Sequence, residues 1–212
     1  MSDPVGQDLL VLVADNDARD VLEVLLGSRT AALGIRALDL TVLRIAGTRD
    51  ADVYRKAHDH LRGMWRHYAH AVVVFDHEGS GAETKPAEDL ESELEARLRR
   101  NGWPENRAAA VAIDPELEAW VWGPLGELAG LWDTAEDHLR RQLVAFDLDA
   151  QGKVRQPKEA LRAIHYRHTQ RPVSGADLMR LARTRGNLAE CRDRAFCKLL
   201  RVLREWFPVE VS

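Results

Sequence analysis

Residues 71–78 read AVVVFDHE, an apolar run that ends in acidic side chains. Residues 9–13 (LLVLV) and residues 108–113 (AAAVAI) follow the same plan, because each run leads directly to aspartates and glutamates. Continuous apolar runs of this kind are typical of parallel strands that are buried on both faces. The acidic residues that follow the three runs are Asp15, Asp17, Asp76, Glu78, Asp114, Glu116 and Glu118.

Parallel strands of one sheet have their carboxyl ends along one edge. Open α/β sheets bind ligands in the crevice outside that edge. Carboxylates gathered there repel one another unless a cation lies among them, and hard cations such as Mg²⁺ take oxygen ligands. The pattern therefore predicts a cation site, with Mg²⁺ or Mn²⁺ as the cofactor.

Strand-like and helix-like patterns alternate through the first half of the chain. The predicted strands are 9–13, 38–45, 71–75 and 108–113, and the predicted helices between them are 18–26, 50–68 and 88–100. This order implies right-handed crossovers and a mostly parallel sheet. The elements predicted after residue 114 are all helices, at 115–122, 135–146, 158–166, 175–183 and 194–207.

We therefore expect an α/β fold, a mostly parallel four-stranded sheet flanked by helices, with an all-helical C-terminal part. Residues 1–122 are the predicted α/β domain, and residues 123–212 are a helical part packed on it. The polar segment 147–157 contains a glycine and is the best candidate for a linker between the two.

The composition favours a cytoplasmic protein without a membrane span. The chain has 212 residues, of which 45% are hydrophobic, but no run of about 18 apolar residues. The first residues, MSDPVGQD, lack the positive and apolar segments of a signal peptide. Cys191 and Cys197 point in different directions on a predicted helix, so we expect no disulfide between them. The net charge of −4 argues against a broad polyanion-binding surface but permits a local basic patch.

Helix capping is an alternative explanation for two of the acidic groups. Asn16 or Asp17 suits the N-cap of the helix that follows the first strand. Asp114 followed by Pro115 suits the start of another helix, with aspartate at the N-cap and proline in the first turn.

Asp76, Glu78 and Glu118 are harder to explain in that way. If the chain stays extended after residue 75, the side chains of Asp76 and Glu78 point the same way and converge. The alternative is a polar turn that closes the buried strand. Glu118 lies next to Trp120, which we expect to be a core residue rather than a stacking platform.

Three segments of the chain resemble a known pattern. Toprim domains carry a glutamate after the first strand and a D-x-D motif after a later one, and they bind Mg²⁺. Here LVADNDARDVLEVLL and VVVFDHEGSG resemble those segments, with DHE in place of D-x-D. IDPELEAWVW resembles the E-x-E-A-W segment of an uncharacterised Toprim-like bacterial family, with Glu116, Glu118 and Trp120 in register. Members of that family often lie in phage-defence gene clusters, including methylation-associated defence systems.

The chain departs from the Toprim pattern at one position. The first-strand glutamate of Toprim enzymes, which the family uses in proton transfer or metal binding, falls on Ala14. Asp15 is the next residue, but its side chain leaves the strand in the opposite direction. The resemblance therefore implies a fold and a metal site more than it implies catalysis.

Basic residues occur in the predicted C-terminal helices, where they form either a phosphate-binding patch or solvated helix faces. No glycine-rich phosphate loop and no GxSxG motif is present in the sequence. The candidate nucleic-acid-binding residues are Arg167, Arg171, Arg194 and Lys198.

We expect a component of a bacterial anti-phage defence system that cleaves nucleic acid with the help of Mg²⁺ or Mn²⁺. The alternative is a catalytically degenerate Toprim-like scaffold that binds partner proteins of a defence complex. Three residues, Asp76, Glu78 and Glu118, are the candidates for catalysis. The candidate metal ligands are Asp76, Glu78, Glu116, Glu118 and Asp15.

Overall fold

A single parallel sheet forms the centre of the protein. The structure is a computed structural model that describes residues 6–45, 47, 49–122, 125–150, 152–184 and 193–209. Neighbouring strands all run parallel, in the order β2-β1-β3-β4. This confirms the predicted α/β fold with a four-stranded parallel sheet. The strands are β1 (Gln7–Val13), β2 (Leu40–Arg44), β3 (Tyr68–Asp76) and β4 (Ala108–Ile113).

Helices connect the strands and make up the C-terminal part. The α-helices are α1 (Asn16–Ser28), α2 (Thr30–Leu33), α3 (Asp50–His60), α4 (Ala87–Arg100), α5 (Leu125–Leu131), α6 (Glu136–Leu143), α7 (Pro157–Thr169), α8 (Gly175–Thr184) and α9 (Arg194–Trp206). The 3-10 helices are η1 (Met64–Arg66), η2 (Leu117–Trp122) and η3 (Val144–Phe146). In the part of the chain that the structure describes, none of these helices has the length and apolar character needed to cross a bilayer.

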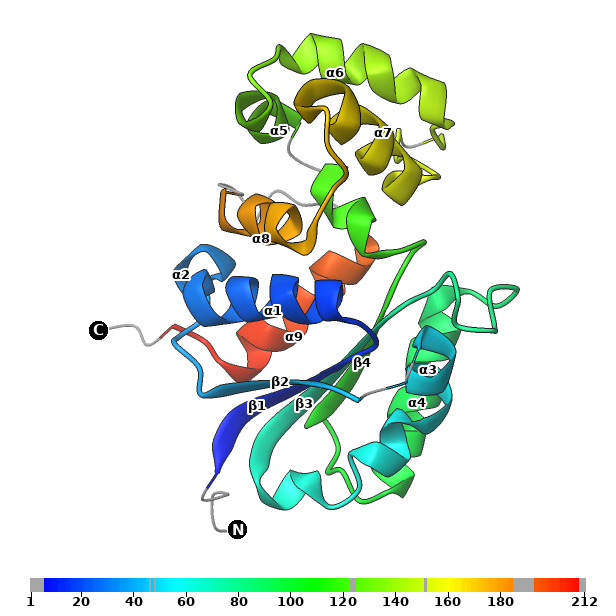
Figure 1. Ribbon diagram of the computed structural model, residues 1–212. Helices are drawn as coiled ribbons and strands as arrows, with labels where there is room; N and C mark the ends of the chain where they lie inside the picture. Colours follow the sequence, from blue (N-terminus) through cyan, green and yellow to red (C-terminus); the bar gives the residue numbers. More distant parts are fainter. Residues whose placement is uncertain are drawn as a thin grey trace.

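Two helical layers cover the sheet (Figure 1). Helices α1 and α9 lie on one face, and α3 and α4 lie on the other. Leu9, Val11 and Val13 pack into the first layer, whereas Leu10 and Leu12 pack into the second. Successive strand residues point to opposite faces, so a strand covered on both sides must be apolar throughout. This is the physical reason for the continuous apolar runs in the sequence.

Helix α9 packs on the sheet although it follows the helical part in the sequence. Ile35 and Pro208 form an antiparallel bridge, and the Arg36 N–H donates to the Phe207 carbonyl over 3.1 Å. Phe196, in the first turns of α9, is completely buried in the core on this face. The chain therefore leaves the sheet after β4 and returns to it, while the boundary at residues 122 and 123 stays a prediction.

The prediction of one helix over residues 50–68 is wrong. Helix α3 ends at His60, and Gly63 has a φ of 80°, in the left-handed region that glycine tolerates best. The chain turns there, passes through η1 and enters β3 at Tyr68. The sequence did not reveal this turn, because Leu61 is buried there and continues the apolar spacing of the helix.

The segment after β4 also differs from the prediction. Asp114 and Pro115 are joined by a cis peptide bond, and the 3-10 helix η2 begins at Leu117. Asp114 is therefore not the N-cap of an α-helix that has Pro115 in its first turn. The expected core role of Trp120 is confirmed, because this side chain is only 3% exposed and its indole N–H donates to Asp193 over 2.9 Å.

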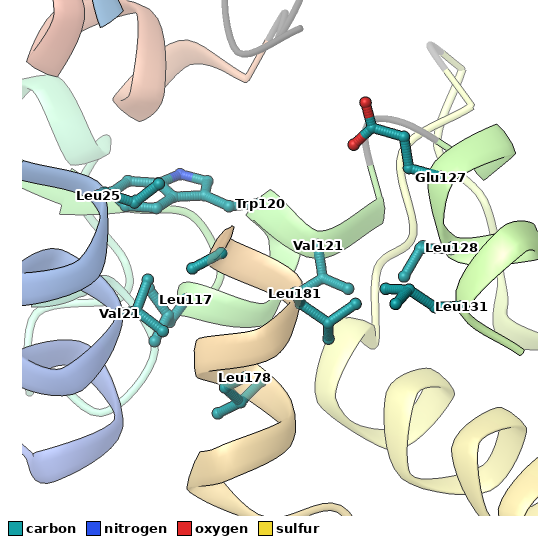
Figure 2. Close-up of a pocket in the computed structure, with 11 residues that line it drawn as sticks. Val21, Leu25, Leu117, Trp120, Val121, Glu127, Leu128, Leu131, Leu178 and Leu181 are labelled. Atoms are coloured by element: carbon teal, nitrogen blue, oxygen red, sulfur yellow. The ribbon is translucent and has the colours of Figure 1, made fainter. Parts of the chain in front are cut away.

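Helices α5, α6 and α7 form a cap beyond the carboxyl edge of the sheet (Figure 1). An apolar hollow lies where the cap meets the sheet domain, between α1, η2, α5 and α8 (Figure 2). Its lining includes Leu25, Trp120, Leu128 and Leu181, together with Glu127 at its rim. The cap and the sheet domain thus meet through apolar side chains on this side of the molecule.

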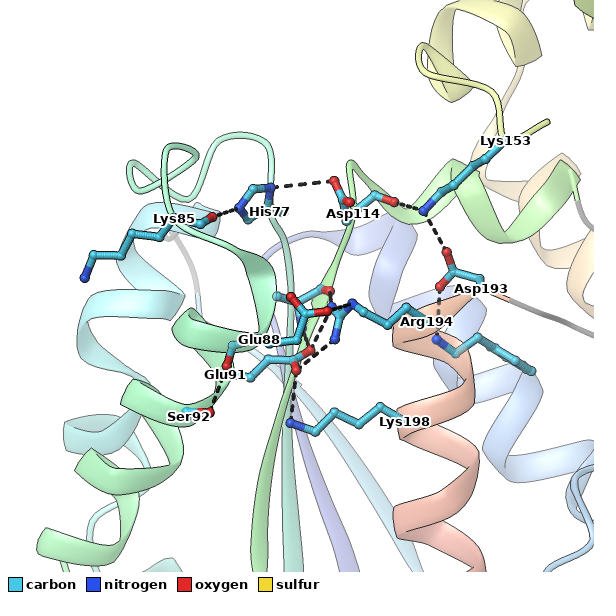
Figure 3. Close-up of polar contacts among 12 residues, drawn as sticks. His77, Lys85, Glu88, Glu91, Ser92, Asp114, Lys153, Asp193, Arg194 and Lys198 are labelled. Atoms are coloured by element: carbon cyan, nitrogen blue, oxygen red, sulfur yellow. Dashed lines mark hydrogen bonds and ion pairs between the residues drawn. The ribbon is translucent and has the colours of Figure 1, made fainter. Parts of the chain in front are cut away.

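Acidic side chains of α4 cover the outer edge of β4 (Figure 3). Glu95 accepts the Ala110 N–H over 3.0 Å, and Glu91 accepts the Ala112 N–H over 2.9 Å. Arg194 of α9 donates to the Ala112 carbonyl over 2.7 Å. These side chains take the place of a further strand, because an edge strand otherwise leaves its backbone groups unpaired.

Charged residues of α9 neutralise the same glutamates. Arg194 lies 2.9 Å from Glu91, and Lys198 lies 3.1 Å from Glu91 and 2.8 Å from Glu95. The Glu91 side chain is only 3% exposed. The network therefore fastens α9 to α4 across the edge of the sheet.

We expect Glu91→Gln to lower the free energy of unfolding by about 2–4 kcal/mol, because it removes the buried negative charge that pairs with both Arg194 and Lys198. Glu88 is the matched control, since it lies on the same helix, 3.2 Å from the same Arg194, but is 59% exposed. Glu88→Gln should cost less than about 1 kcal/mol. Urea unfolding measures both values, and equal losses would contradict a special role for Glu91.

Candidate functional site

Acidic residues from the ends of all four strands gather at the carboxyl edge of the sheet. Asp76 is the last residue of β3, and Asp15 follows β1. Glu118 lies in η2, just beyond β4. Asp50 is the first residue of α3, the helix that follows β2. The parallel order of the strands is what brings these four positions to one side of the molecule.

Asp76 is the centre of this group. Burial is the largest cause that raises the pKa of Asp76 well above its ordinary value. The carboxylates that raise it further are, in order, Asp50, Glu118 and Asp15. Asp76 is thus held in an environment that disfavours its charge unless a cation compensates.

Asp50 is a member of the site that the sequence analysis missed. Its Oδ1 accepts the backbone N–H of Asp76 over 2.8 Å, which places its carboxylate beside the end of β3. Burial raises the pKa of Asp50, and the charge of Asp15 adds to the effect. In the sequence Asp50 marked only a helix start. The order β2-β1-β3, which the sequence does not state, brings it to the edge.

Lys158 of α7 is the second member that was missed. Its Nζ lies 3.0 Å from Glu116 Oε2 and 3.6 Å from Glu118 Oε1. Both glutamates are buried, with 7% and 6% of their surface exposed. Burial alone would lower the pKa of Lys158, but the charges of Glu118 and Glu116 outweigh it, and the pKa lies above its usual range.

The sequence contains a feature that could have identified Lys158 as a member of the site. It follows Pro157 in the first turn of a helix, where the helix dipole disfavours a cation. Glu116 removes this conflict, because its Oε1 accepts the Lys158 backbone N–H over 3.1 Å while its other oxygen binds the ammonium. Glu116 therefore acts as the anionic cap of α7.

Glu78 lies away from the position that the sequence led us to expect. Strand β3 ends at Asp76, and the chain bends at His77 and turns at Glu78 and Gly79, so the condition for convergence is not met. The Glu78 backbone N–H donates to the Pro115 carbonyl over 2.9 Å, while its side chain is exposed. The alternative interpretation, a polar turn that closes the buried strand, is therefore the correct one for the backbone of residues 77–79.

Asp15 is the N-cap of α1. Its Oδ1 accepts the Ala18 N–H over 2.8 Å at the start of α1. The N-cap is Asp15 itself, so the predicted positions, Asn16 or Asp17, are wrong by one or two residues. Burial raises the pKa of Asp17, and the adjacent charge of Asp15 adds to this.

Most of the predicted nucleic-acid-binding residues form ion pairs within the protein. Arg171 donates to both oxygens of Asp177, over 2.5 and 2.6 Å, and this pair holds the pKa of Asp177 far below its usual range. Arg194 and Lys198 belong to the network at the edge of β4 (Figure 3). Arg167 is exposed on α7. Sequence patterns cannot reveal such pairings, because the partners lie on other segments.

The carboxylates are close enough to influence one another but do not converge on one point. In the ranges that the structure describes, no group of three or more His, Cys, Asp or Glu side chains is arranged to hold a metal ion. Comparison of the chain with protein-family models, with curated proteins and with solved structures gave no match. The resemblance to Toprim proteins therefore stays a prediction.

The raised pKa of Asp76 has a consequence for stability. Between the pKa of an unfolded aspartate and the higher pKa of the folded protein, the folded state binds more protons, so stability falls as the pH rises. Asp76→Asn removes the part of this decrease in stability that Asp76 causes. We expect its free energy of unfolding, relative to the wild type, to increase from pH 4 to pH 7 by about 1.4 kcal/mol per unit of raised pKa.

Urea unfolding at several pH values measures this difference. Glu78→Gln is the matched control, because it changes an exposed carboxylate two residues further along. The same pH trend in both variants would contradict the assignment of the effect to the buried environment of Asp76.

Proposed function

We propose that the acidic edge binds Mg²⁺ or Mn²⁺ and that the protein cleaves nucleic acid as a component of a bacterial anti-phage defence system. The observation that carries the proposal is the end of β3, where the Asp50 carboxylate accepts the Asp76 N–H over 2.8 Å and where burial and three further carboxylates raise the pKa of Asp76. None of Asp15, Asp50 and Asp76 forms an ion pair with a described residue. Clustered carboxylates whose charge is only partly neutralised are a favourable environment for a divalent cation.

The chemistry of the donors suits such a cation, although the described side chains are not arranged around one point in this structure. Mg²⁺ prefers oxygen ligands, and Asp76, Asp50 and Glu118 offer carboxylates from three different elements. Asp15 is close enough to act on Asp76, whereas Glu116 is already engaged by α7. The chemistry that a bound Mg²⁺ supplies is the polarisation of a phosphodiester and the activation of water. The protein's part is to hold the ligands at the edge and to position the nucleic acid.

The exposed face of α7 is the surface that best suits a nucleic acid. Arg162, Tyr166, Arg167 and Gln170 line an open hollow there, together with Glu159, Pro172 and Val173. Tyr166 is 53% exposed, which is unusual for a large aromatic side chain. Cations beside an exposed ring are the elements that bind a single strand, since phosphates contact the cations and a base stacks on the ring. The first turn of α7, which contains Lys158, also lies at the acidic edge.

The scaffold alternative has its own support. Ala14 is 4% exposed and lies in the apolar core, so it contributes no acid to the first strand. A degenerate site of this kind would keep the fold and bind other defence-system proteins. Affinity purification of the tagged protein from its native host tests this, and recovery of the protein alone would count against it.

Calorimetric titration with Mg²⁺ and Mn²⁺ tests the metal site. We expect binding in the micromolar to millimolar range for the wild type, and a loss of at least about tenfold in Asp76→Asn and Asp50→Asn, because each removes one anionic ligand. Glu78→Gln is the matched control and should bind as the wild type does. Absence of binding at millimolar metal, with and without nucleic acid, would contradict the proposal of a metal-dependent nuclease.

Fluorescence anisotropy with labelled single-stranded oligonucleotides tests the α7 surface. In EDTA, which prevents cleavage, we expect Arg162→Glu combined with Arg167→Glu to weaken binding by at least about tenfold, since two phosphate contacts become repulsive. Arg99→Glu combined with Arg100→Glu is the control, with the same charge change on exposed α4 residues. Equal losses in the two double variants would show nonspecific attraction by net charge.

A further inference from the structure

Lys158 reaches the acidic edge from outside the sheet domain. It belongs to α7 of the cap, and its side chain remains 33% exposed while its ammonium lies against buried glutamates. The 3.0 Å contact with Glu116 is a direct hydrogen bond, whereas the 3.6 Å contact with Glu118 is a looser ion pair. Glu116 thus anchors the lysine, and Glu118 is the partner that a competing cation can take.

The ammonium of Lys158 acts on most of the edge. Its charge opposes the rise in pKa of several carboxylates that come from different strand ends. These carboxylates are Asp17, Asp50, Asp76 and Glu118. The contacts with Glu116 and Glu118 show where this charge lies, and there it partly offsets the repulsion among the carboxylates, as a bound cation would.

We propose that Lys158 is a built-in counter-ion that competes with divalent metal for Glu118 and thereby sets the metal affinity of the edge. This inference rests on the proposed metal site. A metal ion that binds Glu118 must displace the ammonium or tolerate its repulsion, and either one weakens binding. The exposed part of the lysine side chain leaves room for the ammonium to turn away, for example towards a phosphate of the substrate.

Titration of Mn²⁺ by calorimetry compares the wild type with Lys158→Met, which keeps the length of the side chain and removes its charge. We expect Lys158→Met to bind Mn²⁺ at least about tenfold more tightly, because a repulsive unit charge within a few ångströms is removed. Lys158→Arg keeps the charge and should remain within about threefold of the wild type.

Lys153→Met is the matched control. Lys153 lies just before α7, is also 33% exposed and also pairs with an acid, but that acid is Asp193, the N-cap of α9. Its replacement should leave the Mn²⁺ affinity unchanged. Should Lys158→Met lose its folded structure, the double variant Lys158→Met with Glu116→Gln removes the unpaired buried charge and keeps Glu118 for the same comparison.

The outcomes separate this inference from the proposed function. Equal Mn²⁺ affinity in the wild type and Lys158→Met overturns the competition while the metal site stands. Tighter binding in Lys158→Met without any cleavage of nucleic acid supports the competition and overturns the nuclease. Absence of binding in every variant overturns both.

Discussion

The contact between Glu116 and Lys158 is the interaction on which the site depends. Glu116 follows β4, and Lys158 lies in the first turn of α7, so this pair ties the cap to the carboxyl edge of the sheet. Trp122 strengthens the same junction, because its indole N–H donates to the Pro157 carbonyl over 3.0 Å. One carboxylate thereby caps a helix, neutralises an ammonium and orients that ammonium towards Glu118. The cap thereby contributes a positive charge to the acidic edge.

The outer edge of β4 and the carboxyl ends of the strands differ in their balance of charge. At the edge of β4, Glu91 and Glu95 meet Arg194 and Lys198, and backbone groups of the strand are satisfied at the same time. At the carboxyl edge, acidic groups gather around Lys158 in excess of its single charge, and the pKa of Asp76 is raised. The balanced network explains stability, whereas the unbalanced one is the physical basis for proposing a cation site.

Local patterns predicted the elements but not the polar contacts between them. The apolar runs identified the strands because burial on both faces demands continuous hydrophobicity, and Leu90, Leu94 and Leu98 identified α4 by their spacing. The prediction of one helix over residues 50–68 was wrong because the chain turns at Gly63, although the apolar spacing continues through the turn. The predicted convergence of Glu78 with Asp76 was wrong because it assumed an extended chain beyond the last residue of β3. Arg171, Arg194 and Lys198 read as a basic surface because their partners are distant in the sequence.

The sequence by itself determined the parallel sheet and the acidic character of its carboxyl edge, since both follow from hydrophobic runs and the residues that end them. Only the tertiary structure decided which acids belong together. It brought Asp50 beside Asp76 through the order of the strands, and it moved Glu78 away through a turn. It also placed Lys158 among the carboxylates. Long-range electrostatics of this kind depends on which segments meet in space, and no local pattern carries that information.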